Sequence, residues 1–369
     1  MRKRGLKTRA LAKELHEAGL LSEEGRGKME VSPRTKFLKT LNSQKAGVEK
    51  QGGECLIMMM YLFFAVLMLS CVYAQAQTIT ETFGSGANQF SIDFVEIGNP
   101  GNAADTTGSP NPAGSVAYTY SMGKYEISRD VVNKANLSGA FGVQMFVFAD
   151  PDRNTGKKPA AGVSWYEAAR FVNFLNTISG NTAAYKFDLN GNFQLWTVSD
   201  AGYNPNNLFR NSLAKYFLPS NDEWYKSAYG SPQGTWFDYP TGSDLAPTSV
   251  SGGTNSDTAV YGQDIIADVD NAGGLSAYGT MAQGGNLREW METAWDKVND
   301  AAHEDRTIRG GPWYNPVRNL DSSNRFAAVP ELEENRNGFR VAMVPEPSSL
   351  SLLLAGGAVF AAARRRRLV

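Results

Sequence analysis

The alternation of apolar and polar residues predicts short strands in the middle of the chain. Residues 90–97 (FSIDFVEI) place apolar and polar side chains in turn, with the period of two that a half-buried strand requires. Residues 118–127 (YTYSMGKYEI) follow a similar pattern and predict a second strand. Neither segment is long, so the strands are expected to be joined by many turns.

Two serine-based signals predict helices in the same region. Ser164 is followed three residues later by Glu167, and Ser220 by Glu223, which is the spacing of a capping box at a helix start. After Ser164, apolar residues recur on one face of the predicted helix. Short helices among glycine-rich turns and short strands predict an irregular α+β domain over residues 77–343.

A long apolar stretch at residues 56–74 lies ahead of this domain. It carries no charge and ends in Ala74-Gln75-Ala76, a small-x-small pattern typical of signal peptidase sites. We therefore predict a signal peptide over residues 55–76. A retained membrane anchor is the alternative, because about 20 apolar residues suffice to span a bilayer. Residues 1–54 are basic and unpatterned, and they are predicted to be a disordered lead or to precede the true start.

The C-terminal segment, residues 344–369, has three parts in a fixed order. A Pro-Glu-Pro turn at residues 345–347 leads into an apolar stretch at 350–363, and four arginines follow at 364–367. One interpretation is a simple anchor with its basic end in the cytoplasm. The order also resembles the PEP-CTERM sorting signal of Gram-negative bacteria. That resemblance implies export to the cell envelope or extracellular matrix, membrane contact through the tail, and an exosortase-type protease as partner.

Charge and residue inventory exclude several functions. Between residues 77 and 363 there are nineteen Lys and Arg against thirty Asp and Glu, and such an acidic body repels nucleic acid. The two cysteines, Cys55 and Cys71, both lie in or beside the predicted signal peptide, so its removal leaves no thiol. With only His16 and His303, the chain cannot form a three-histidine iron centre.

Six segments in order resemble the formylglycine-generating enzyme (sulfatase-modifying factor) family. They are residues 122–127 (MGKYEI), 161–176 (AGVSWYEAARFVNFLN), 217–229 (FLPSNDEWYKSAY), 285–290 (GNLREW), 309–313 (RGGPW) and 337–341 (NGFRV). The resemblance covers nearly the whole body of the chain. It implies that family's fold, which is related to C-type lectins and has little regular secondary structure.

The resemblance also identifies where the family's chemistry would lie. In active members, two cysteines after the Arg-Gly-Gly turn bind copper and activate oxygen, and the matching positions here are Asn315 and Leu320. Neither side chain supplies the soft thiolate that Cu(I) requires, so copper and the oxidase reaction are not expected. Pro312 and Arg288 depart from the family pattern as well, which has serine and an apolar residue there.

A structural calcium ion is the other implied cofactor. The matching residues are Gly285, Asn286, Leu287 and Glu289, which offer carbonyls and one carboxylate. Oxygen ligands in a tight glycine turn suit a hard cation, and the acidic loops agree with it. The alternative is a glycine turn beside a solvated glutamate, and both interpretations stay open.

The family's ligand cleft would be formed by the segment after the Arg-Gly-Gly turn. Arginines there can pair with carboxylates or sulfates, and aromatic rings can stack on a ligand. Arg309 and Arg340 have a structural alternative, in which they anchor loops through carbonyl hydrogen bonds, and we favour it for Arg340. The candidate ligand-binding residues are Trp313, Tyr314, Asn315, Arg318 and Arg325.

Together these patterns predict an exported, non-catalytic module that binds a peptide or glycan. One alternative is an enzyme of the same family with altered chemistry, although the sequence identifies no nucleophile and base for it. Another is a scaffold for a neighbouring hydrolase or transporter. Family membership by itself does not decide among them, because one fold supports many functions.

Overall fold

The computed structural model describes residues 78–139 and 142–344. The predicted lead at 1–54 and signal peptide at 55–76 lie outside the described residues, and so does the sorting segment beyond residue 344. Within the described part of the chain, no helix combines the length and apolarity needed to cross a bilayer.

Each α-helix of the described chain begins at a serine that caps it. Both predicted capping boxes are confirmed, at Ser164 and Ser220, and a third helix begins after Ser128, whose side chain accepts the N–H of Val131. A capping side chain satisfies a backbone N–H that the first helical turn leaves unpaired. The helices are α4 (Arg129–Leu137), α5 (Trp165–Ile178) and α6 (Asn221–Tyr229), with short 3₁₀ turns η1 (Gly86–Asn88), η2 (Pro151–Asn154) and η3 (Val317–Asn319).

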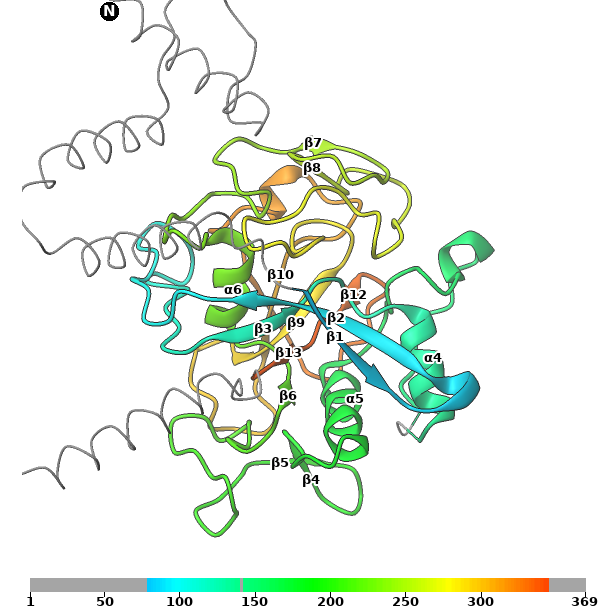
Figure 1. The fold of residues 1–369 in the computed structure, drawn as a ribbon, viewed down its shortest axis with the longest axis vertical. Helices are drawn as coiled ribbons and strands as arrows, with labels where there is room; N and C mark the ends of the chain where they lie inside the picture. The colour runs from blue at the N-terminus through cyan, green and yellow to red at the C-terminus, as the bar shows by residue number, and fades with distance from the viewer. Residues whose placement is uncertain (1–77, 140–141, 345–369) are drawn as a thin grey trace, which may run out of the picture. The chain divides into compact units, whose positions relative to one another are not determined.

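The larger sheet runs through the centre of the domain (Figure 1). Its strand order is β1 (Thr78–Phe83), β2 (Phe90–Ile97), β3 (Tyr120–Gly123), β13 (Ala342–Met343) and β6 (Tyr216–Phe217), all antiparallel to their neighbours. The strand predicted at 90–97 is confirmed. The one predicted at 118–127 is shorter, because after Gly123 the chain turns and Ile127 instead hydrogen-bonds Phe339.

A second sheet carries three of the sequence motifs. Its order is β11 (Phe326–Ala328), β10 (Arg306–Arg309), β9 (Arg288–Ala294) and β12 (Asn337–Gly338). Two small pairs, β4 (Lys186–Phe187) with β5 (Phe193–Gln194) and β7 (Thr248–Ser249) with β8 (Thr258–Ala259), lie at opposite ends of the domain in Figure 1. The motifs at 285–290, 309–313 and 337–341 therefore meet around β9.

Three tryptophans fill the interior between these sheets and helices. Trp165, Trp224 and Trp290 are fully buried, which suits their large apolar rings. Each indole N–H has an acceptor: Trp165 donates to the Met291 carbonyl at 3.0 Å, Trp290 to the Val163 carbonyl at 2.8 Å, and Trp224 to a carboxylate. The core thus combines large apolar area with satisfied polar atoms.

Candidate functional site

Two glycine turns meet where β9 begins and β10 ends. The N–H of Gly285 donates to the Gly310 carbonyl at 2.8 Å, and the Trp313 N–H donates to the Asn286 carbonyl at 2.9 Å. Gly285 has φ +92°, and a Cβ there would lie 2.3 Å from the Val260 carbonyl oxygen. Only glycine accepts both the conformation and the close approach, so these motif glycines fix how the two loops pack.

Glu289 and Arg340 form an ion pair with no solvent exposure. Two guanidinium nitrogens of Arg340 each lie 2.6 Å from a Glu289 oxygen, and the Trp224 indole donates to Oε2 at 2.7 Å. Arg340 also donates to the carbonyls of Gly123 and Met281. It therefore anchors loops through carbonyl hydrogen bonds, which is the structural role favoured from the sequence.

These contacts bear on the calcium predicted at Gly285, Asn286, Leu287 and Glu289. Both Glu289 oxygens already accept strong hydrogen bonds, and Arg340 supplies the positive charge that a cation would bring. Over residues 78–139 and 142–344, no group of three or more His, Cys, Asp or Glu is arranged to hold a metal ion. The surroundings of the Glu289 carboxylate do not fit calcium, whose assignment here stays a prediction without geometric support.

Glu126 lies beside this ion pair, and its carboxyl group accepts hydrogen bonds from the turn that follows Gly285. Its oxygens accept the Asn286 side-chain amide at 2.5 Å and the Leu287 N–H at 2.9 Å. Burial raises the pKa of Glu126 to about 8, and the Glu289 charge adds to the rise, against the effect of Arg340 and the two hydrogen bonds. Glu126 therefore keeps its proton to a higher pH than an ordinary glutamate does.

The two positions that the family resemblance assigns to copper ligands are a buried packing position, Leu320, and a half-buried loop position, Asn315. The Leu320 side chain is fully buried, and its carbonyl accepts the Tyr229 hydroxyl at 3.0 Å. Asn315 is half-buried, and its carbonyl accepts the Gly262 N–H at 2.9 Å. The described residues include no cysteine.

The structure separates the five predicted ligand-binding residues. Trp313 is buried and packs edge-to-face against Phe148, with ring centroids 6.1 Å apart. Tyr314 is 43% exposed, and its hydroxyl accepts from Arg336 at 2.5 Å. Arg318 is exposed, four residues further along the same loop.

Arg325 turns to a different neighbour. Its guanidinium stacks 3.9 Å from the centre of the Trp295 ring and donates to the Trp295 carbonyl at 3.0 Å. Residues 312–325, hereafter the 312–325 loop, therefore present Tyr314 and Arg318 to solvent, while Trp313 belongs to the interior.

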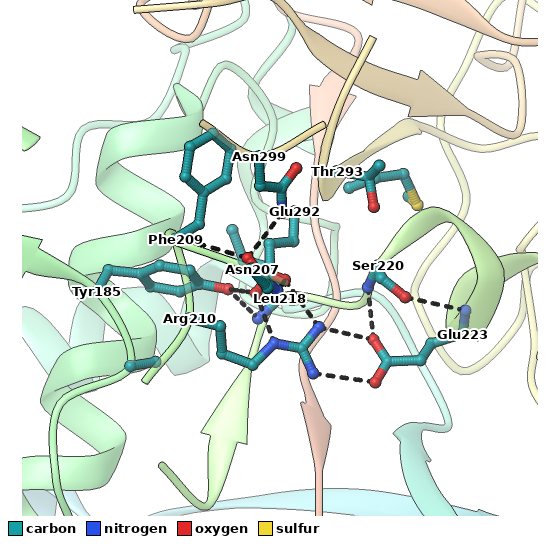
Figure 2. A network of polar contacts seen from close by, with 12 residues as sticks. Tyr185, Asn207, Phe209, Arg210, Leu218, Ser220, Glu223, Glu292, Thr293 and Asn299 are labelled. Atoms are coloured by element: carbon teal, nitrogen blue, oxygen red, sulfur yellow. Dashed lines mark hydrogen bonds and ion pairs between the residues drawn. The ribbon is translucent and has the colours of Figure 1, made fainter. Parts of the chain in front are cut away.

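A larger polar network lies between α6 and β9 (Figure 2). The sequence identified Glu223 only as part of a capping box and gave no indication of its other partners. Arg210 bridges two buried carboxylates, with Nη2 2.9 Å from Glu223 and Nε 2.7 Å from Glu292. Tyr118 donates to Glu223 and Tyr185 donates to Glu292. Each of the four carboxylate oxygens accepts two hydrogen bonds, the others coming from further Arg210 nitrogens, the Ser220 N–H and the Asn207 amide.

Arg210 and Glu223 hold each other in their ionised forms. Burial alone would raise the pKa of Glu223, but Arg210 outweighs it and the pKa is lowered. Burial would likewise lower the pKa of Arg210, and the two carboxylates raise it well above its usual range. Saturated carboxylates of this kind have no lone pair left for acid–base work, so the network is structural.

Comparison with solved structures shows the same fold. Treponema denticola variable protein 1 is 19% identical, with a TM-score of 0.50 over 73% of this chain and 100% of its own. A structure titled CarF is 18% identical, with a TM-score of 0.51 over 69% of this chain and 99% of its own. At such identities the likeness establishes the fold alone, which is α+β and C-type-lectin-like as predicted. Among curated proteins, none matches this sequence.

Family models account for nearly all of the described chain and for the tail. The model of the sulfatase-modifying factor enzyme 1-like domain matches residues 89–344, and the model of the PEP-CTERM protein-sorting motif matches residues 344–367. The sorting motif marks a protein exported to the cell envelope. Since the first match covers well over half of the sequence, this chain belongs to the formylglycine-generating, sulfatase-modifying factor family.

Proposed function

We propose that this exported protein is a binding module of the cell envelope rather than an oxidase, and that it binds an acidic peptide or glycan. One observation carries the proposal: the 312–325 loop holds Asn315 and Leu320 where copper thiolates would stand. The same loop turns Tyr314 and Arg318 toward solvent. The loop thus has no thiolate ligands for copper, but it has an exposed guanidinium and an aromatic ring that can contact a ligand.

The replaced positions argue against copper on chemical grounds. Cu(I) prefers thiolate sulfur, and neither an amide nor an isobutyl group substitutes for it. The Leu320 side chain is also buried. It packs so closely against Gly284 that a Cβ added to this glycine would lie 3.2 Å from the Leu320 Cγ. A side chain packed this tightly contributes to the core and leaves no space for a metal ion.

An acidic ligand follows from the exposed groups. The side chain of Arg318 has no partner within the described part of the chain, so its guanidinium is available for a bidentate bond to a carboxylate or sulfate. The half-exposed ring of Tyr314, four residues earlier in the same loop, offers a flat surface. The body of the protein is acidic, but at physiological ionic strength charges beyond about 8 Å are largely screened, and the local guanidinium dominates.

Binding of two defined probes tests the proposal. The mature exported protein is immobilised and titrated with alginate, a polymer of uronic acids, and separately with poly-glutamate. We expect one of them to bind, and the double variant Tyr314→Ala/Arg318→Ala to lose affinity about tenfold or more, as for a hydrogen bond to a charged group.

Lys157→Ala is the matched control, since it also removes one exposed positive charge but lies elsewhere, paired with Asp270. It is expected to leave affinity unchanged. Binding of neither probe, or equal binding by the loop variant and the wild type, would contradict the proposal. The identity of the probe that binds distinguishes a peptide ligand from a glycan.

A further inference from the structure

A cavity lies where β2 and the chain that follows β3 separate. The two segments are joined as far as Asp93, whose carbonyl accepts the Lys124 N–H at 2.7 Å. After this bond the chain turns away from β2, and the Ile127 N–H donates to the Phe339 carbonyl at 3.0 Å. Helix α4 packs beside β2 (Figure 1) and contributes Val131 to the wall of the cavity. The cavity is therefore a consequence of the early end of β3.

The cavity has room for a small organic molecule. Its volume is about 160 Å³, and an apolar cavity of about 150 Å³ can enclose a benzene ring. Its apolar wall is formed by Ile92, Ile127, Val131 and Val269. Ser91, which also lines it, is exposed, so solvent reaches the cavity. An aliphatic chain of a few carbons matches both this room and this wall.

Two carboxyl groups line the same cavity, and neither is neutralised by an ion pair. Asp93 is half-buried, and its Oδ1 accepts the Thr80 hydroxyl at 2.7 Å. Glu126 is buried, and each of its oxygens accepts one hydrogen bond, which leaves each a second lone pair. Over residues 78–139 and 142–344, no Lys, Arg or His lies within ion-pair distance of either group. Asp93 thus supplies a negative charge, and Glu126 supplies a further acceptor whether or not it is ionised.

Positive charge is missing from the wall of this cavity. None of the described residues that line it is a lysine, arginine or histidine. Lys124 precedes the lining residue Tyr125, but its ammonium lies over the Tyr125 ring, 5.3 Å from the ring centre. The start of α4 offers no free N–H either, because those of Arg129, Asp130 and Val131 donate to two carbonyls and to the capping serine. A ligand in the cavity therefore meets carboxyl oxygens and no charged donor.

We propose that this cavity binds a primary ammonium group carried on a short aliphatic chain. An ammonium has three donors, for which Asp93 and Glu126 provide acceptors, and the chain packs against the apolar wall. A neutral ligand of the same shape leaves the charge of Asp93 uncompensated, and an anion is repelled by it. A free alkylamine and a lysine side chain of a peptide share this chemistry. The site has no residue in the 312–325 loop and does not depend on the proposed function.

Two molecules of the same shape test the inference. n-Butylammonium and n-butanol are titrated separately into the mature exported protein at pH 7, where the amine is protonated, and binding is followed by NMR. For the ammonium, a Kd of roughly 1–10 mM is within the reach of a ligand of about five non-hydrogen atoms. The alcohol is expected to bind about tenfold more weakly, because it forms no hydrogen bond between charged groups. This comparison uses the wild type and does not depend on any variant's folding.

A matched pair of variants locates the site. Asp93→Asn removes the charge but keeps an oxygen for the Thr80 hydroxyl, and it is expected to bind butylammonium about tenfold more weakly. Asp130→Asn is the control and should keep the wild-type Kd. It removes an exposed carboxylate of α4 that pairs with Lys134 at 2.9 Å and does not line the cavity.

A third titration, with Nα-acetyl-lysine methylamide, distinguishes the two sources of the ammonium group. Binding at least as tight as that of butylammonium identifies lysine side chains of peptides as the ligand, and weaker binding identifies a free amine. Three results would overturn the proposal: no binding of butylammonium, equal binding of butylammonium and butanol by the wild type, or equal binding of butylammonium by Asp93→Asn and the wild type.

Discussion

The polar network between α6 and β9 and the 312–325 loop treat charge in opposite ways. In the network, Arg210 lies between two buried glutamates whose four oxygens are all saturated. In the loop, the side chain of Arg318 is exposed and forms no hydrogen bond or ion pair with the residues that the structure describes, and Tyr314 is half-exposed. The network uses charge to join elements distant in sequence. The loop leaves its charge available to something outside the molecule.

Under the proposed function, this difference separates the scaffold that the chain shares with its family from the loop in which it departs from the family pattern. The Glu289–Arg340 pair follows the pattern of the network, because it is buried and completely satisfied. The 312–325 loop contains Asn315 and Leu320, the positions that the family resemblance assigns to the copper ligands. Under the proposed function, the scaffold is retained around a loop that has no copper chemistry.

Removing the cation at the centre of the network should have the largest effect. Arg210→Met leaves Glu223 and Glu292 buried without compensation, and breaking one buried pair costs about 3–5 kcal/mol. We expect a loss of at least that size in the free energy of unfolding, measured by urea denaturation. Arg318→Met in the loop is the matched control and should change stability by less than about 0.5 kcal/mol. Similar losses for the two variants would erase the distinction between the regions.

The second buried pair should behave in the same way, with a smaller effect. Arg340→Met is expected to cost about 3–5 kcal/mol, because Glu289 then remains unpaired. The double variant Arg340→Met/Glu289→Gln should recover part of this loss. Since Arg340 already neutralises Glu289, added Ca²⁺ should leave the Tm of the wild type unchanged. A calcium-dependent rise in Tm would restore the calcium site predicted from the sequence.

The glycine turn that joins the two regions provides an intermediate effect. Gly285→Ala places a Cβ against the Val260 carbonyl at φ +92°, and strain of this kind costs about 1–3 kcal/mol. The same denaturation experiment measures it. Gly86→Ala is a suitable comparison, because that glycine also has a positive φ but open space around its Cβ. A smaller loss at Gly285 than at Gly86 would show that the close approach is unimportant.

The raised pKa of Glu126 predicts that the stability of the protein depends on pH. The folded protein keeps a proton on Glu126 up to about pH 8, whereas the unfolded chain releases it near the ordinary value of 4.5. The unfolded state thus binds fewer protons, so stability falls as pH rises through this window, by at most about 1.4 kcal/mol per pH unit. Denaturation at pH 5 and 7 should show the fall, and Glu126→Gln should flatten it. If the free energy of unfolding changed equally with pH in the wild type and in Glu126→Gln, a group other than Glu126 would be responsible for the pH dependence.

The sequence predicted features set by neighbouring residues. Ser164 and Glu167 are three positions apart, so their capping box can be recognised without knowledge of the fold. The helix after Ser128 was missed, although its capping serine and the buried Val132 and Ala135 provide a similar signal. The predicted strand at 118–127 was too long, because alternation does not indicate where a chain turns toward a partner such as Phe339.

Contacts between distant residues could not be predicted in this way. Arg210 and Glu292 are 82 positions apart, and no local pattern relates them. Glu289 was correctly placed in a family motif, but the motif does not specify whether a metal ion or an arginine neutralises it. Only the fold brings Arg340, 51 positions later, to that carboxylate.

Copper-dependent oxidation tests the central claim most directly. The mature exported protein is supplied with Cu(I), oxygen and a cysteine-containing peptide of the kind that sulfatases present, and bound copper and peptide aldehyde are measured by mass spectrometry. With Asn315 and Leu320 in place of thiols, we expect neither stoichiometric copper nor aldehyde. Stoichiometric copper together with aldehyde would contradict the account.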